Sequence, residues 1–64
     1  MNLEYTTSMS ECYITRSGKR IIISLTSEGW NVFVRMPGTN GEEIATRCSK
    51  REALQIAREQ YYAR

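Results

Sequence analysis

The hydrophobic pattern of the chain changes at Ser49, and this change divides the sequence into a sheet and a helix. Before Ser49, apolar and polar residues alternate in stretches such as ECYITR, RIIISLT and WNVFVRM. A period of two in β-branched and aromatic residues is typical of strands. The sequence SKRE at Ser49–Glu52 is a capping box, in which the two outer side chains satisfy backbone N–H groups at a helix start. The residues from Ser49 to Arg64 include no Gly or Pro, so the pattern predicts one C-terminal helix over residues 49–63.

The segments before the helix predict an antiparallel meander. Turn residues stand at Ser17-Gly18-Lys19, at Ser27-Glu28-Gly29 and in the Pro37–Gly41 loop. They separate predicted strands at residues 11–16, 20–26, 30–36 and 42–48, of which the last has the weakest pattern. Short connections join antiparallel neighbours. We therefore predict an α+β fold in a single domain, with a three- or four-stranded sheet over residues 11–48 in the order β-β-β-β-α. Residues 1–9 are predicted to be a loose N-terminal arm.

A single helix covers only one face of such a sheet, so the other face is predicted to be open. Alternation assigns the more apolar set of each strand to the helix side: Cys12, Ile14, Ile21, Ile23, Leu25, Trp30, Val32, Val34, Met36, Ile44, Thr46 and Cys48. The opposite face then carries Tyr13, Thr15, Ile22, Ser24, Thr26, Asn31, Phe33, Arg35, Ala45 and Arg47. Antiparallel sheets commonly leave one face to water. This face has two aromatic rings, an Ile and two Arg, whereas a face exposed only to water would carry mostly small polar and charged residues. We therefore predict that this face binds a partner.

The sequence lacks the residue types and motifs that most enzymes and metal sites use. The chain has no His, so the usual acid–base group at neutral pH is absent. Its two Cys fall short of the four ligands that a structural zinc site requires. The sequence has neither a phosphate-binding Gly-rich loop nor a nucleophile beside a base. We therefore predict a protein that is not an enzyme and uses no metal and no cofactor.

The compartment is predicted to be the cytoplasm. The longest apolar run is Ile21–Ile23, far shorter than the ~20 residues of a membrane span. The first residues, MNLEYTTSMSE, are polar and acidic, unlike a signal peptide. In a reducing compartment Cys12 and Cys48 are free thiols. A bridge between them is the alternative, and it requires facing strands and an oxidising compartment.

Two functions are compatible with the predicted open face. Net charge is +2, and positive charge gathers on the first hairpin and on the C-terminal segment. Aromatic side chains on a sheet stack on bases and arginines contact phosphate, so nucleic-acid binding is the first candidate. The candidate binding residues are Tyr13, Arg16, Lys19, Arg20, Asn31, Phe33, Arg35 and Arg47. The alternative is a protein-interaction or inhibitor module, including a homodimer that buries the same face. In a third arrangement the N-terminal arm covers the face and buries Phe33 beneath Leu3 or Tyr5.

One known family shares a pattern with this chain. The stretch Gly29-Trp30-x-Val32-x-Val34, with Ser49-Lys50-x-Glu52-Ala53-x-x-x-Ala57 further on, resembles the arm-type DNA-binding domains at the N-termini of phage integrases. In that family a three-stranded sheet precedes a helix, and the sheet face away from the helix enters the major groove. Over residues 18–62 the resemblance implies a phage or prophage accessory factor. It also implies DNA contacts by Thr15, Asn31, Arg35 and Arg47.

Overall fold

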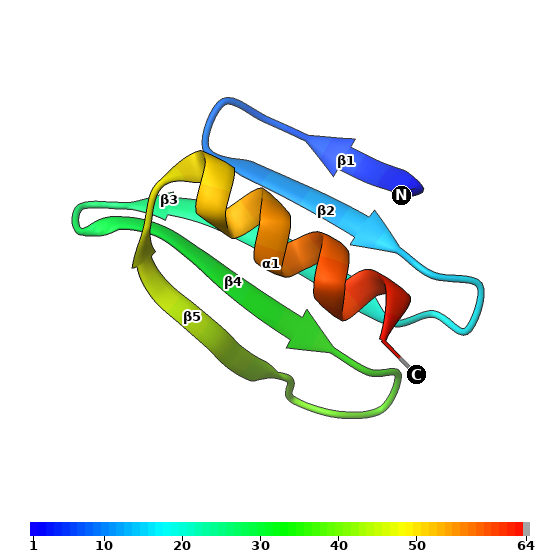
Figure 1. Cartoon of the computed structure of the whole chain (residues 1–64). Helices are drawn as coiled ribbons and strands as arrows, with labels where there is room; N and C mark the ends of the chain where they lie inside the picture. The colour runs from blue at the N-terminus through cyan, green and yellow to red at the C-terminus, as the bar shows by residue number, and fades with distance from the viewer. Residues whose placement is uncertain (64) are drawn as a thin grey trace.

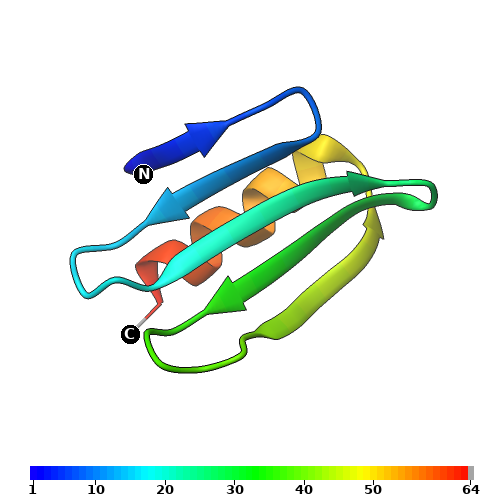
Figure 2. The same ribbon diagram turned by 180° about the vertical axis from the view of Figure 1, so that it is seen from behind.

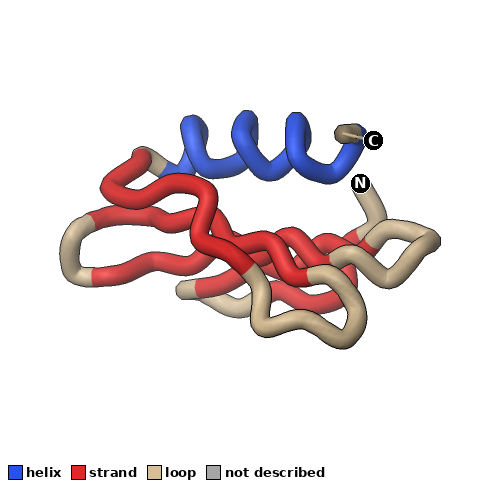
Figure 3. Tube along the Cα trace, turned by 90° about the horizontal axis from the view of Figure 1, so that it is seen from below, coloured by secondary structure: helices blue, strands red, loops and turns tan. Residues whose placement is uncertain are grey.

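A five-stranded antiparallel sheet lies beneath one helix in the computed structural model, which describes residues 1–63 (Figure 1). The elements are β1 (Leu3–Thr6), β2 (Ser10–Ile14), β3 (Arg20–Thr26), β4 (Gly29–Arg35), β5 (Glu42–Cys48) and α1 (Lys50–Tyr62). The strands lie side by side in chain order, and each neighbouring pair is antiparallel. The view from below shows the helix and the sheet as two layers (Figure 3). The α+β class and the meander are confirmed, whereas the predicted three or four strands are corrected to five.

The additional strand lies in the segment predicted to be a loose arm. Leu3 pairs with Tyr13 and Tyr5 with Cys12, so β1 extends the sheet at the edge opposite β5. The N–H of Ile14 donates to the Asn2 carbonyl at 2.9 Å. The Asn2 N–H in turn donates to the Tyr61 hydroxyl at 3.1 Å. These bonds hold the segment beside β2, so it does not lie across the open face. The alternative in which it buries Phe33 is therefore wrong.

The capping box forms as the sequence predicts. The Ser49 hydroxyl accepts the Glu52 N–H, and the Glu52 carboxylate accepts the Ser49 N–H, both at 3.1 Å. Further along the helix, Ala53 and Ala57 are fully buried. Because their side chains are small, α1 packs closely on the sheet. No basic residue lies in the last turn of α1. Instead, Lys19 from the β2–β3 turn donates to the Gln60 carbonyl, where the helix dipole favours a cation.

The core is small and lies between α1 and the central strands. Ile21, Ile23 and Val32 are fully buried against Ala53 and Ala57. The half-buried side chains packed around them are Trp30, Val34, Ala45, Cys48, Leu54, Ile56 and Tyr61. The predicted helix side of β3 and β4 is therefore confirmed, including Trp30. Within residues 1–63, no helix has the length and the apolar character to cross a membrane.

Two strands face differently from the prediction. In β2, Tyr13 pairs with Ile21 on the helix side and Cys12 pairs with Ile22 on the other side. Both residues can be buried, so composition alone does not decide between the two registers. In β5 the pairing shifts twice, and Arg47 has a φ of 58°. These irregularities bring Ala45 opposite Val32 on the helix side, because each extra residue reverses the alternation of faces.

Candidate functional site

The side of the sheet away from α1 is covered by no other element of residues 1–63 (Figure 2). We call this side the open face. Its members follow from the cross-strand register, because directly paired residues point to the same side. They are Glu4, Tyr5, Ser10, Cys12, Ile14, Arg20, Ile22, Ser24, Thr26, Asn31, Phe33, Arg35 and Glu43.

The centre of the open face is apolar. Ile22 lies directly opposite Phe33, and both side chains are half-buried. Phe33 is contacted from one side by the β4–β5 loop: a Cβ on Gly41 would lie 2.5 Å from its ring. The Gly41 backbone therefore lies against the ring, and only a residue without a side chain fits there. Both Phe33 and Ile22 keep part of their surface exposed.

An ion pair occupies the β1 side of the open face. The Arg20 guanidinium donates two hydrogen bonds to Glu4, at 2.9 and 3.1 Å. This pair joins β3 to β1 across β2, where Cys12 is 0% exposed and lies 3.7 Å from the carboxylate. The Arg20 guanidinium lowers the pKa of Glu4. Burial, followed by the Glu4 charge, raises the pKa of the Cys12 thiol to about 11, so this thiol is protonated and unreactive at neutral pH.

Two charges on the β4–β5 side have no charged partner among the described residues. The ion pairs within residues 1–63 are Glu4–Arg20, Glu28–Arg47 and Glu11–Lys50. Arg35 takes part in none of them and donates only to the Thr39 carbonyl at 3.2 Å. Glu43 also takes part in none, and it accepts from the Asn31 amide at 3.3 Å. Both side chains neighbour Phe33: Glu43 is opposite it across the strand pair, and Arg35 is two residues further along β4.

The structure brings together only half of the predicted binding residues. Arg20, Asn31, Phe33 and Arg35 share the open face, and the other four lie elsewhere. Tyr13 was predicted on this face, and it lies on the helix side instead, where its hydroxyl donates to Glu11.

The other three predicted residues belong to turns or bulges. Lys19 is used at the end of α1. Arg16 is exposed in the β2–β3 turn. Thr15, to which only the integrase resemblance assigned a DNA contact, lies in the same turn, where its hydroxyl accepts the Lys19 N–H. Arg47 lies at a bulge of β5 and pairs with Glu28 at 2.9 Å. The expected basic platform is therefore dispersed.

The predicted binding residues include neither acidic member of the open face. Glu43 follows a simple alternation with Glu42 and Ile44, so its side was readable from the sequence. Glu4 was not, because its segment is too short to show a period and its partner Arg20 is distant in the chain. With both included, two arginines and two glutamates share the face, and its net charge is close to zero.

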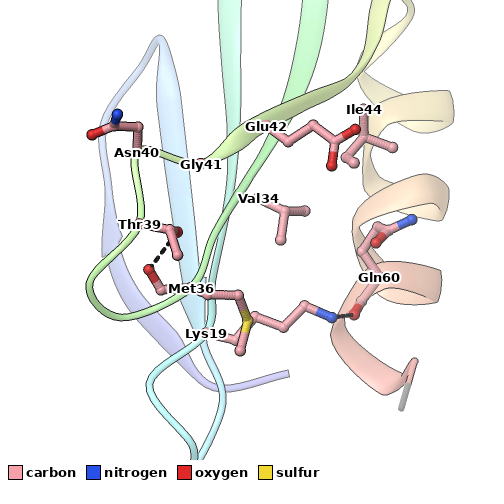
Figure 4. A pocket seen from close by; sticks show the side chains of 9 residues that line it. All are labelled: Lys19, Val34, Met36, Thr39, Asn40, Gly41, Glu42, Ile44 and Gln60. Atoms are coloured by element: carbon pink, nitrogen blue, oxygen red, sulfur yellow. Dashed lines mark hydrogen bonds between the residues drawn. The ribbon is translucent and has the colours of Figure 1, made fainter.

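A pocket lies on the helix side, between the end of α1 and the β4–β5 loop (Figure 4). It has a volume of about 430 Å³, and its apolar lining comes from Val34, Met36 and Ile44. The Lys19 amine lies at its rim, bound to the Gln60 carbonyl. Among the described residues, no group of three or more His, Cys, Asp or Glu side chains is placed to hold a metal ion.

Comparison of the chain with known protein families, with curated proteins and with solved structures found no match. The resemblance to the arm-type domains of phage integrases therefore stays a prediction.

Proposed function

We propose that this protein is a small, non-enzymatic binding module that binds another protein through the open face. The observation that carries the proposal is an apolar centre surrounded by balanced charges. The apolar centre consists of Ile22 and Phe33, and the charges around it are Glu4, Arg20, Arg35 and Glu43. Surfaces that bind nucleic acid carry an excess of positive charge, because the phosphate backbone dominates their affinity. An apolar centre with a polar rim is instead the anatomy of a protein interface.

The size of the molecule is compatible with this role. Its accessible surface is 4531 Å². A standard interface takes ~800 Å² from each partner, which is less than a fifth of that area. One face of the sheet is therefore a sufficient binding surface. A domain with so few fully buried side chains also gains stability from a partner that covers apolar area.

Nucleic acid is the second candidate, and one observation favours it. Arg35 lies directly opposite Arg20 in the β3–β4 register, and like charges opposite each other are unfavourable. Glu4 neutralises Arg20, but Arg35 keeps an unpaired charge that a phosphate would satisfy. The integrase-like pattern assigns DNA contact to the same Arg35. Against this candidate, the phosphates would also face Glu43.

Photo-crosslinking from each face tests the proposal. A benzophenone amino acid at Ser24 lies on the open face, and one at Glu59 lies on the exposed side of α1. After irradiation in native cell extract, we expect protein crosslinks from position 24 and not from position 59. Equal crosslinking from both positions contradicts the proposal. Recovery of nucleic acid from position 24, with affinity that falls steeply with salt, establishes the second candidate instead.

We also infer a cytoplasmic location, and the cysteines support it. Both are free thiols. Cys12 lies in β2 on the open face, whereas Cys48 lies opposite Trp30 in β5 on the helix side. They cannot bridge without a change of fold, and free thiols are the norm in reducing compartments.

A further inference from the structure

We propose that the partner bound by the open face is a second copy of this chain, related by a two-fold axis that passes between Phe33 and Ile22. This inference rests on the proposed function, since it names the occupant of the same face. The basis is two unpaired charges, Arg35 and Glu43, which both neighbour Phe33 on this face.

The register fixes the relation between these two charges. Side chains two residues apart on one strand face are separated by ~7 Å, and neighbouring strands are ~4.8 Å apart. Arg35 is one such step along β4 from Phe33, and Glu43 is one strand across from it. The two charges therefore lie at opposite ends of a diagonal past the Phe33 ring. A two-fold axis in the plane of the face, perpendicular to this diagonal, exchanges its ends.

This axis makes the face complementary to itself. Each Arg35 meets the Glu43 of the other copy, and the symmetry forms both ion pairs at once. The same axis runs on to Ile22, which lies opposite Phe33 on β3. The half-buried Phe33 and Ile22 of one copy then pack against those of the other. The apolar centre of the face becomes the centre of the interface, with the charges at its rim.

Charge complementarity favours this occupant over nucleic acid. A phosphate backbone satisfies Arg35 but leaves Glu43 among anions, and an uncompensated charge in an interface is costly. A second copy supplies both opposite charges in the required arrangement. Arg20 is already satisfied by two hydrogen bonds to Glu4, so it requires nothing from the partner. The charges of Glu4 and Arg20 thus cancel, and the β1 side of the interface carries no net charge.

A charge exchange across the interface tests the proposal. The mass of the wild-type chain is measured by sedimentation from micromolar to millimolar concentration, and we expect a reversible dimer. R35E and E43R each place like charges at both symmetry-related contacts, so each should weaken the dimer about 10- to 100-fold. R58E, on the exposed side of α1, is the control and should leave dimerisation unchanged.

Mixing the two variants gives the distinguishing result. In an equimolar mixture of R35E and E43R, each new carboxylate at position 35 faces a new guanidinium at position 43. A one-to-one heterodimer should therefore form from two chains that are monomeric alone, and the double variant R35E/E43R should recover a homodimer. Fluorescence of Trp30, which lies on the helix side, reports whether each variant is folded.

Either of two results overturns the second copy as partner. The first is a wild-type chain that stays monomeric at millimolar concentration. The second is a dimer that R35E and E43R leave intact, or that their mixture fails to restore. The proposed function is judged separately: protein crosslinks from position 24 by a monomeric chain support a different protein partner. A monomer without such crosslinks refutes both proposals.

Discussion

Replacement of Gly41 by Ala should destabilise the fold because the new methyl group and the Phe33 ring would occupy the same space. Gly41 has a φ of 87°, and a Cβ added there would lie 2.5 and 2.6 Å from two ring carbons. Carbon atoms in contact prefer ~3.5–4.0 Å. The ring or the loop must therefore move by about 1 Å, and the substituted residue keeps an unfavourable backbone conformation.

The expected loss follows from these two effects. A positive φ in a residue with a side chain costs about 1–2 kcal/mol, and overpacking costs about 1–3 kcal/mol. Gly41→Ala should therefore lower the free energy of unfolding by about 2–5 kcal/mol. A domain of 64 residues has a total stability of about 3–10 kcal/mol. The substitution thus removes a large part of it and lowers the Tm by at least about 8 °C.

Gly38 provides a matched control in the same loop. Its φ is 77°, but a Cβ there would meet no atom within 4 Å, so Gly38→Ala should cost only the backbone term of about 1–2 kcal/mol. Urea unfolding is followed by Trp30 fluorescence at micromolar concentration, where self-association contributes little. Phe33→Leu in the Gly41→Ala background should recover part of the loss. Equal losses for Gly41→Ala and Gly38→Ala would refute the contact between the loop and the ring.

Three further predictions concern the edges and the titrating groups. Tyr61→Phe removes a hydroxyl that joins α1 to β2 and to the N-terminal segment; it should cost about 1–2 kcal/mol and speed amide exchange in β1, and unchanged exchange there would contradict it. Cys12 is buried and its pKa is raised to about 11, so iodoacetamide should label the half-buried Cys48 first in the native protein. Peptide mass spectrometry measures the two labelling rates, and equal rates would contradict this order. A hydrogen bond from Arg20 lowers the pKa of Glu4. Hydrogen bonds from Tyr13, which has the larger effect, and from Lys50 lower the pKa of Glu11. Their stabilisation is complete above the unfolded pKa of ~4.3 and is lost as the pH falls through the folded values, so acid titrations should show a shallower loss for Glu11→Gln than for the wild type.

The parts of the fold that sequence reasoning predicted are those with long or redundant local signals. The strands β3 and β4 each have seven residues, enough for alternation to define a buried side. The side assigned to Trp30, Val32 and Val34 is confirmed. The helix start was readable because Ser49 and Glu52 act on backbone groups within one turn. In each case the decisive interaction is local.

The parts that failed depend on distant residues. β1 has four residues and is held by pairing with β2 and by Tyr61, neither of which is visible in its own sequence. The face of Tyr13 depends on register with β3. In β5 a non-Gly residue, Arg47, adopts a positive φ, which the local sequence does not predict. Glu4 was missed for the same reason, since it pairs with Arg20 only through the sheet.

The contact between the two ends of the described chain has a practical consequence for handling the protein. The Met1 amine lies 3.4 Å from the Tyr62 hydroxyl, and Figure 3 shows the N-terminus beside the end of α1. Both ends thus lie on the helix side. A tag, a fluorophore or a surface tether attached at either end therefore points away from the open face. Tethered copies present that face outward, so immobilised protein is a suitable bait for testing what it binds.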